Sequence, residues 1–214
     1  SIEDNDNYFC IKGDISNEKV VQNILRQHTP DVIVNFAAES HVDRSIDNPL
    51  EFIKTNVLGT SNLLNETCRW IKSMSIEAIN DFKFIQISTD EVYGSLGSEG
   101  SFTESTAYNP SSAYSASKAS SDHLARSWFK TFNFPVIITN CSNNYGPYQF
   151  PEKLIPLMVI NALSDKKLPI YGKGLNVRDW LYVEDHCRAI YRVIERGIPG
   201  QTYNIGGNNE ITNI

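Results

Sequence analysis

Short apolar runs alternate with longer segments of helical periodicity, and this alternation constrains the fold more than any other feature of the chain. The runs 8–11, 31–36, 82–87 and 136–139 have the length and composition of buried strands. The segments between them, 16–27, 48–70 and 112–132, have the apolar spacing of helices. Alternating strands and helices predict βαβ units, so we expect an α/β fold built on a parallel sheet.

Polar residues mark the expected helix starts. Ser16 can cap the first helix, and Ser112 can cap the helix that is expected to run to Phe132. Asn48 followed by Pro49 combines a capping residue with a first-turn proline, and the helix that follows is expected to reach Trp70.

Composition excludes several classes of function. The 214 residues carry a formal net charge of −6, whereas a nucleic-acid surface needs clustered excess Lys and Arg. No apolar run approaches the roughly 20 residues of a membrane-spanning helix, so we expect no membrane partner. The four cysteines lie far apart without metal-ligand spacing, a pattern typical of free thiols in a reducing compartment. We therefore expect a cytoplasmic protein without a metal site.

The informative polar residues follow the expected strands. Parallel sheets bind ligands at the carboxyl ends of their strands. Those ends are Asp14, residues 37–41, residues 88–91 and residues 140–144. Beyond Pro147 the elements become shorter, so we expect residues 1–146 to form the main domain and residues 147–214 a smaller substrate-binding portion, with 184–205 returning to the sheet.

One glycine pattern does not fit a phosphate-binding turn. Gly94, Gly97 and Gly100 have the spacing of such a turn, but they lie several residues beyond a strand and do not lead into a helix. We interpret this segment as a flexible loop.

Tyr114 and Lys118 form the first candidate catalytic pair. Residues four apart project from the same face of a helix. A phenol ordinarily loses its proton near pH 10, and a neighbouring cation favours the phenolate. The pair could therefore remove a proton from a substrate hydroxyl. Tyr and Lys are common on helix surfaces, however, so the spacing alone is a weak signal.

A second group of candidates ends the third expected strand. Residues 88–94 read Ser-Thr-Asp-Glu-Val-Tyr-Gly, and Thr89 offers a hydroxyl for the same substrate oxygen. Asp90 and Glu91 are adjacent carboxyls, and one of such a pair can stay neutral while the other is charged. In isolation, a solvated turn is the alternative interpretation of the two acids.

The motif at 88–94, followed by Tyr114-x-x-x-Lys118, resembles the extended short-chain dehydrogenase/reductase family. Within it, Thr-Asp-Glu resembles the nucleoside-diphosphohexose 4,6-dehydratases, and the whole chain is most similar to the dTDP-glucose members. Sugar 4-epimerases lack the acidic pair, and UDP-glucuronate decarboxylases resemble Thr-Ser-Glu there, which makes Asp90 the most diagnostic residue. The other matching segments are 35–45, 55–60, 140–148, 150–156 and 177–183.

The resemblance implies a Rossmann-like, doubly wound sheet that binds NAD, and a nucleotide-sugar substrate. Its expected cofactor contacts are Asp14, Ile15, Ala37, Ala38, Glu39, Thr55, Tyr114, Lys118 and Asn144. Its expected substrate contacts are Ser40, Thr89, Asn143, Lys153, Leu154, Pro169, Ile170, Tyr171, Arg178 and Asn213. A guanidinium suits phosphate oxygens, although Arg178 could instead form a surface ion pair with Asp179. His41 is expected to be a structural loop residue.

The resemblance also implies a reaction and its alternatives. Tyr114, with Thr89 and Lys118, would remove the proton of the sugar 4-hydroxyl while the C4 hydride passes to NAD. Glu91 would then remove the C5 proton, and Asp90 would protonate the departing C6 hydroxyl. The alternatives are a UDP- or CDP-hexose dehydratase, a 4-epimerase or decarboxylase on the same scaffold, and an inactive binding relative.

The chain departs from the family at its ends. Residues 1–7 do not read as a signal peptide, and the glycine-rich phosphate turn and the ribose-binding acid are absent from the sequence. We therefore expect a piece of a longer protein, inactive by itself. The family also implies a homodimer formed through the helices around 49–70 and 112–132.

Overall fold

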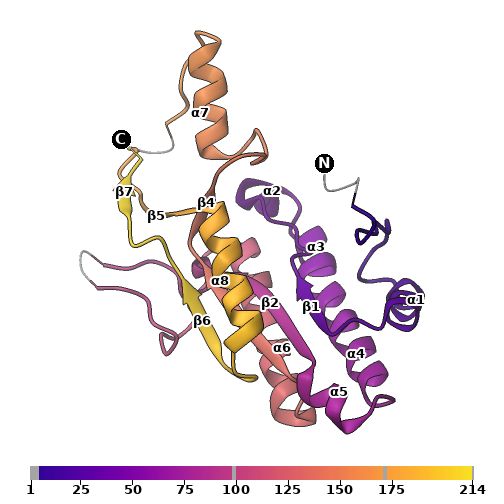
Figure 1. Ribbon diagram of the computed structural model, residues 1–214. Coiled ribbons are helices and arrows are strands. Elements are labelled where there is room, and N and C mark those ends of the chain that lie inside the picture. Colours follow the sequence, from indigo (N-terminus) through magenta and orange to yellow (C-terminus); the bar gives the residue numbers. More distant parts are fainter. Residues whose placement is uncertain (1–4, 98–99, 171–172, 214) are drawn as a thin grey trace.

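The computed structural model describes residues 5–97, 100–170 and 173–213. Its central sheet has the strand order β1-β2-β3-β6, and all neighbouring strands are parallel. The strands are β1 (Val32–Asn35), β2 (Lys83–Thr89), β3 (Val136–Cys141) and β6 (Thr202–Ile205) (Figure 1). The segment that was expected to return to the sheet thus supplies β6, which pairs with β3.

Helices cover both faces of this sheet. Phe84, Val136 and Ile138 point to one face, where they pack with α1 (Glu18–His28), α4 (Thr60–Ile71) and α6 (Ala113–Phe132). Ile85 and Ile137 point to the other face, toward α8 (Val183–Arg196). Successive side chains of a strand alternate between faces, so unbroken apolar runs bury both faces of the sheet. The expected α/β, Rossmann-like doubly wound sheet is confirmed.

The segment after Asn48 is helical, but it is not one regular α-helix. It consists of α3 (Pro49–Phe52), a π-helix (η2, Ile53–Gly59) and α4. A π-helix does not change the apolar composition of a segment, which is why apolar spacing predicted one continuous helix. Gly59 allows Ile15 to pack closely in this region, because a Cβ there would lie 2.9 Å from the side chain of Ile15, which would have to move.

Two predictions near the N-terminus are wrong. Residues 8–11 form no strand, and Tyr8, Phe9 and Ile11 are 40–71% exposed. A short apolar run becomes a strand only when another strand pairs with it, and no strand in the described part of the chain does so. The first helix is capped by Asn17 rather than by Ser16. The backbone N–H and the hydroxyl of Ser16 instead donate to the Asp14 carboxylate.

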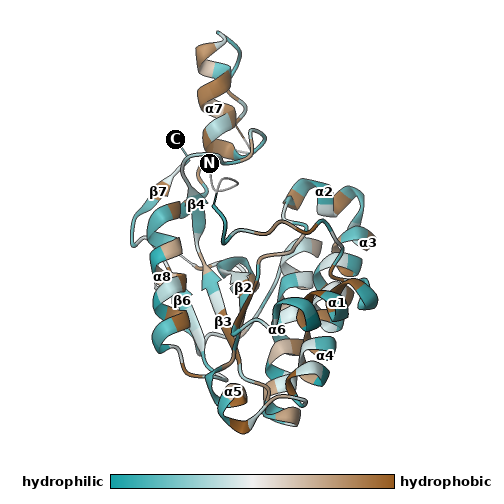
Figure 2. Ribbon diagram, turned by 45° about the vertical axis from the view of Figure 1, so that its right-hand side comes forward, coloured by the Kyte–Doolittle hydropathy of each residue, from teal (hydrophilic) through white to brown (hydrophobic). Residues whose placement is uncertain are grey.

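The C-terminal part forms a second, smaller sheet. β4 (Asn143–Tyr145) pairs in parallel with β5 (Val177–Tyr182), and β5 pairs antiparallel with β7 (Glu210–Thr212). Helix α7 (Leu154–Leu163) stands away from the central sheet and is largely apolar (Figure 2). Short helices complete the fold: α2 (Val42–Asp47), α5 (Ile76–Asp81) and the 3-10 turn η3 (Asp90–Tyr93). Over the described ranges, no helix has the length and apolar character to cross a membrane.

Candidate active site

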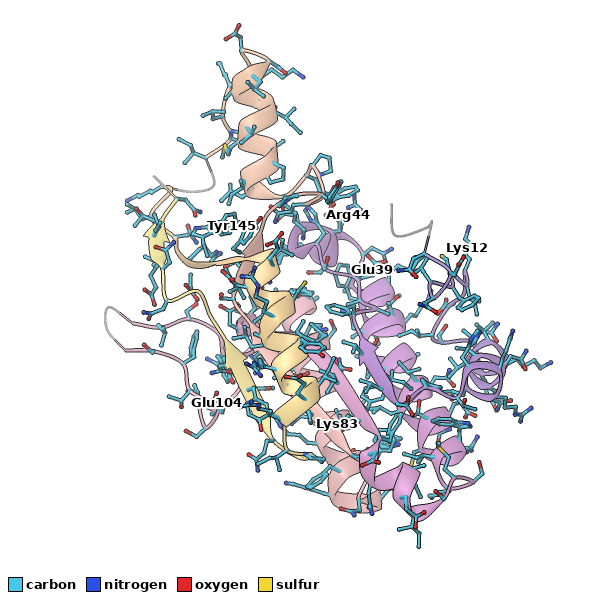
Figure 3. All side chains as sticks on the ribbon, viewed as in Figure 1. Lys12, Glu39, Arg44, Lys83, Glu104 and Tyr145 are labelled. Atoms are coloured by element: carbon cyan, nitrogen blue, oxygen red, sulfur yellow. The ribbon has the colours of Figure 1, made fainter. Side chains whose placement is uncertain are left out.

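The carboxyl ends of the parallel strands meet at one edge of the central sheet. β2 runs from Lys83 to Thr89, and Thr89 pairs with Cys141 at the end of β3. In Figure 3, Lys83 lies toward one end of the sheet, whereas Glu39 and Tyr145 lie near the other. The loops that follow the strands therefore gather at one edge, where a parallel sheet binds its ligands.

Helix α6 brings Lys118 to this edge. The helix starts with a reciprocal capping box between Ser112 and Ser115, which satisfies backbone donors at its first turn. The Lys118 side chain is buried, at 5% exposure, and its Nζ donates to the carbonyl oxygen of Ile87 at 2.6 Å. Lys118 is thus held against the end of β2, at the residue that precedes the Ser-Thr-Asp-Glu motif.

Tyr114 lies one helical turn before Lys118 and packs edge-on against Phe52, with ring centroids 6.4 Å apart. Burial raises the pKa of its phenol well above the ordinary value, and the charges of Glu91, Cys141 and Asp90 add to this. A hydrogen bond with Thr89 acts in the opposite direction. The net pKa of Tyr114 in the described structure therefore lies above its ordinary value. That Lys118 favours the phenolate stays a prediction.

The acidic pair is held by a tight turn. Thr89 ends β2, and its Oγ1 accepts from the backbone N–H of Glu91 and donates to the Asp90 carboxylate, both at 3.3 Å. Asp90 and Glu91 are both partly buried, so the turn is not a fully solvated one.

Both carboxyls have raised pKa values. Burial and the neighbouring Glu91 raise the pKa of Asp90 to about 6. Burial also raises the pKa of Glu91, while Arg178 and Lys153 lower it. Side chains that titrate nearer to neutral pH are suited to donate and accept protons. The turn therefore presents two candidate acid–base groups beside Tyr114.

A residue that the sequence analysis did not single out connects the expected cofactor contacts. Asn56 lies in η2 next to Thr55 and is 1% exposed. Its side chain accepts from the backbone N–H of Glu39 at 2.8 Å and donates to the Glu39 carbonyl at 3.0 Å. It also donates to Ser117 of α6 at 2.8 Å. Asn56 thus joins the loop that contains Ala37 and Ala38 to the helix that carries Tyr114.

The structure gives Asp14 and Ile15 local roles. The Asp14 carboxylate accepts from the backbone N–H and hydroxyl of Ser16, both at 2.8 Å, and the backbone hydrogen bond lowers its pKa most. Ile15 packs against Gly59, and its carbonyl accepts from Asn62 at 2.7 Å. Their expected position at the adenine end of a dinucleotide stays a prediction.

Asn143 and Asn144 begin β4 beside the strand ends. The Asn144 amide nitrogen donates to the Ser142 carbonyl at 3.1 Å and to the Cys141 Sγ at 3.4 Å. Its Oδ1 is buried and has no hydrogen-bond partner in the described part of the chain, as is also true of the Ser142 hydroxyl. Buried polar groups are normally paired, so the Asn144 oxygen fits a ligand that donates an N–H.

Two cations, Lys153 and Arg178, face the acidic pair from the smaller part of the molecule. Lys153 Nζ donates to the Ser40 carbonyl at 2.9 Å. Arg178 is exposed on β5 and is not paired with Asp179, whose carboxylate instead accepts from two backbone N–H groups in the loop before β7. Among the described residues, Arg178 therefore does not form the ion pair that was its alternative interpretation, and its Nη1 donates to the neighbouring Val177 carbonyl at 3.5 Å.

The remaining expected substrate contacts come from several elements. Leu154 starts α7, and Pro169 and Ile170 follow that helix. The Asn213 Oδ1 is buried without a partner among the described residues. Tyr171 lies outside the described residues.

His41 caps α2 by accepting from the backbone N–H of Arg44 at 3.5 Å, which is consistent with a structural loop residue.

Gly94 closes the turn after the acidic pair. Its φ is +87°, and a Cβ at this position would lie 2.4 Å from the Asn109 carbonyl. The requirement for glycine is thus conformational.

No group of three or more His, Cys, Asp or Glu side chains is arranged to hold a metal ion within 5–97, 100–170 and 173–213.

A parallel sheet covered by helices on both faces, with a Tyr-x-x-x-Lys helix at its strand ends, defines a Rossmann-like protein of the short-chain dehydrogenase/reductase class. Within this class the family is shown directly. A family model described as GDP-mannose 4,6 dehydratase matches residues 1–214, and the chain belongs to that family.

Known proteins and structures that are similar to this chain include dTDP-glucose 4,6-dehydratases. A dTDP-glucose 4,6-dehydratase of Escherichia coli is 54% identical over an alignment of 222 residues that covers 100% of this chain and 61% of that protein. The chain thus spans about three fifths of the length of the curated relatives it matches. A crystal structure of dTDP-glucose 4,6-dehydratase from Bacillus anthracis, in complex with NAD, is 53% identical with a TM-score of 0.88. The match covers 99% of this chain and 62% of that one.

A different enzyme has nearly the same fold. UDP-glucuronic acid 4-epimerase from Bacillus cereus, in complex with UDP-glucuronic acid and NAD, is 30% identical with a TM-score of 0.87, and the match covers 99% of this chain and 64% of that one. Fold similarity alone therefore does not separate a dehydratase from an epimerase, and the distinction depends on the site residues.

Proposed function

We propose that the protein containing this chain is an NAD-dependent lyase that converts dTDP-glucose to dTDP-4-keto-6-deoxyglucose. The observation that carries the proposal is the pair of partly buried carboxyls, Asp90 and Glu91, whose charges act on the Tyr114 phenol at the strand ends. Oxidation at C4 needs a base such as Tyr114, whereas loss of water needs an additional acid and base. The names of the relatives that are 54–55% identical support the same activity.

The residues at the sheet edge fit NAD. The Asn144 Oδ1, which has no hydrogen-bond partner among the described residues, suits a carboxamide N–H. Bound NAD would supply a hydride acceptor for C4, a hydride donor for C6, and a positive ring that favours the Tyr114 phenolate. The residues proposed to hold it are Asp14, Ile15, Ala37, Ala38, Glu39, Thr55, Tyr114, Lys118 and Asn144.

In the first step, Tyr114 accepts the proton of the 4-hydroxyl. Thr89, whose side chain acts to lower the pKa of Tyr114, orients the same sugar oxygen. The buried ammonium of Lys118 supplies positive charge on the same helix face, which favours the anionic form of the base.

In the second step, Glu91 removes the C5 proton, which the new 4-ketone has made acidic. Asp90 gives its proton to the C6 hydroxyl, which leaves as water. The raised pKa of Asp90, about 6, lets this carboxyl hold a proton under conditions in which an exposed Asp would be ionised. Glu91 then returns its proton to C5 when C6 is reduced.

The substrate is held by the smaller part of the molecule. Lys153 and Arg178 lower the pKa of Glu91, so both cations lie close to this carboxyl. We propose that they bind the diphosphate, with Leu154, Pro169, Ile170, Tyr171 and Asn213 around the nucleotide. Ser40, Thr89 and Asn143 are proposed to contact the sugar. This assignment makes residues 1–146 the NAD-binding domain and residues 147–214 part of the substrate-binding domain.

The test is an assay of the full-length protein with dTDP-glucose, UDP-glucose and CDP-glucose. Mass spectrometry is expected to show a product that is lighter than dTDP-glucose by one water, with slower conversion of the other two. Preferred conversion of UDP- or CDP-glucose would change the assigned nucleotide only. An epimer of unchanged mass, or release of carbon dioxide from a hexuronic acid, would reassign the reaction, and no reaction at all would favour a binding relative.

The assembly and location belong to the same proposal. We propose a homodimer formed through the helices around 49–70 and 112–132, because α2, α3 and η2 expose Ile46, Leu50, Ile53 and Leu58 at 41–70%. We also propose a cytoplasmic location. Cys10, Cys68, Cys141 and Cys187 are free thiols, which agrees with a reducing compartment.

A further inference from the structure

One buried carboxylate lies next to the candidate site and has no role in the steps above. Asp122 follows Tyr114 and Lys118 on α6 at the same four-residue spacing, so the three side chains share one face of the helix. Asp122 is 0% exposed. A carboxylate is almost never fully buried unless hydrogen bonds and opposite charges compensate for the lost hydration, so its surroundings need an explanation.

The hydrogen bonds around Asp122 show which state of the carboxyl is supported. Its Oδ2 accepts from the Ser88 hydroxyl at 2.7 Å and from the Tyr108 hydroxyl at 3.0 Å. The Tyr108 oxygen itself accepts from Arg126 at 2.7 Å and from Asn140 at 3.1 Å, so its single proton is left for Asp122. Two donors directed at one carboxylate oxygen stabilise the ionised form.

The same carboxylate is connected to the reacting end of the site through Ser88. Ser88 stands between Ile87, whose carbonyl accepts from Lys118, and Thr89, which begins the acidic turn. Two helical residues, Lys118 and Asp122, therefore hold two consecutive residues at the end of β2.

Charge couples the two helical residues directly. The groups that face Lys118 are Asp122 on α6 and Cys141 on β3, and Asp122 favours the charged ammonium. The charged groups that face Asp122 are Lys118 and Arg126, and each favours the carboxylate. Burial opposes both charges, and it raises the pKa of Asp122 to about 6. Each charge thus offsets part of the desolvation of the other.

We propose that Asp122 is a positioning residue that keeps the buried Lys118 side chain protonated and, through Ser88, fixes the end of β2 that carries Thr89. Its effect on catalysis rests on the proposed function of Tyr114 and Lys118. Its effect on the charge of Lys118 does not, and can be measured without substrate.

The direct test is NMR of the full-length protein labelled with [13C]lysine, with Lys118 assigned by the loss of its signal in Lys118→Met. In Asp122→Asn, which removes the charge but keeps an acceptor, we expect Lys118 to lose its proton at a pH lower by about one unit. Glu66→Gln is the matched control, because Glu66 is also buried, at 3% exposure, but on α4 with Arg69 and Gln22 as partners. The control is expected to leave the Lys118 titration unchanged.

A second measurement does not depend on the stability of the Asp122→Asn variant. In the unmodified protein, the Lys118 signal is expected to shift as Asp122 titrates near pH 6. Asp90 also titrates near pH 6, so the shift must persist in Asp90→Asn. A Lys118 signal without such a shift, or a Lys118 titration that is the same in Asp122→Asn, would overturn the proposal.

Activity then separates this proposal from the function. If the protein is the proposed dehydratase, Asp122→Asn should lower turnover and move the alkaline limb of its pH profile to lower pH by about the same amount as the NMR titration. A shifted NMR titration in a protein that does not dehydrate sugar nucleotides would support the role of Asp122 and reject the function. An unshifted titration in an active dehydratase would reject the role of Asp122 and support the function.

Discussion

Tyr114 has a raised pKa in the structure, although its proposed task is to accept a proton. Burial and the charges of Glu91, Cys141 and Asp90 all favour the neutral phenol. The base is therefore suited to its task only when positive charge enters the site. This dependence makes the Tyr114 hydroxyl the most informative single atom to remove.

Tyr114→Phe in the full-length protein removes that hydroxyl and retains the ring that packs against Phe52. We expect turnover of dTDP-glucose to fall by roughly a thousandfold or more, because the proton acceptor for the 4-hydroxyl is lost. Circular dichroism and the melting temperature should stay close to those of the unmodified protein. A folded variant with near-normal turnover would contradict the role of Tyr114.

Glu91→Gln separates oxidation from elimination. Only removal of the C5 proton requires the Glu91 carboxylate, so oxidation at C4 should continue while water loss is blocked. Mixing this variant with dTDP-glucose should therefore produce an NADH absorbance that persists. Equal impairment of oxidation and elimination would show that Asp90 and Glu91 do not have distinct roles.

Asp90 should lower the stability of the folded protein at neutral pH. Its folded pKa is about 6 against an ordinary value of 3.8, so folding holds its proton more tightly and stability falls as the pH rises from about 4 to about 6. A shift of about two pKa units corresponds to about 2 to 3 kcal/mol. Asp90→Asn should increase the free energy of unfolding by this amount at pH 8, and by little at pH 4.

Urea unfolding of the full-length protein at both pH values checks this prediction. Equal effects of Asp90→Asn at pH 4 and pH 8 would show that folding does not raise the pKa of this carboxyl. A stabilised but inactive variant at pH 8 is expected, because the proposed general acid would then be missing.

Sequence analysis identified the candidate residues that stand in recognisable motifs and missed those that support them. Tyr114 and Lys118 could be predicted because helical spacing places them on one face, and Asp90 and Glu91 because they follow a strand. Asn56 and Asp122 could not, because a polar residue in a helix usually faces solvent and no spacing rule reveals that a side chain is buried. Their roles depend on partners far away in the sequence, Glu39 and Ser88 respectively.

At the scale of elements, the π-helix η2 carries residues that support the candidate site. It carries Thr55 and Asn56, and Asn56 holds the Glu39 loop and α6 together. Isolated π-helical turns are frequently found at functional sites. The sequence predicted a helix here, but apolar spacing does not distinguish a π-helix from an α-helix.

The helices around 49–70 and 112–132 should form the subunit interface. Leu50 and Leu58 are 66% and 58% exposed, and a second copy would bury them. Sedimentation of the full-length protein at micromolar concentration should show a dimer, and the double variant Leu50→Glu, Leu58→Glu should be monomeric. Ile76→Glu on α5, where the side chain is 74% exposed, is the matched control and should remain dimeric. A monomeric unmodified protein would contradict this interface.

For the whole molecule, the order of elements predicted β1, β2 and β3 of the central sheet, whereas β6 was expected only as a segment that returns to the sheet. Each of the runs 31–36, 82–87 and 136–139 contains or overlaps a strand, because an apolar run between two helices can be buried only inside a covered sheet. The run 8–11 was the exception, since composition does not reveal whether a strand has a neighbour. The second sheet was not predicted, because β4 and β7 are short and partly exposed and lack a hydrophobic pattern.

The central claim is that one site removes water from a sugar nucleotide while it moves a hydride from C4 to C6. The most direct measurement uses dTDP-glucose deuterated at C4, the full-length protein, and NMR with mass spectrometry of the product. We predict a 4-keto-6-deoxy product that carries at C6 the deuterium that was at C4 of the substrate. Recovery of a sugar that has kept its C6 hydroxyl, epimerised at C4 or unchanged, would contradict the claim.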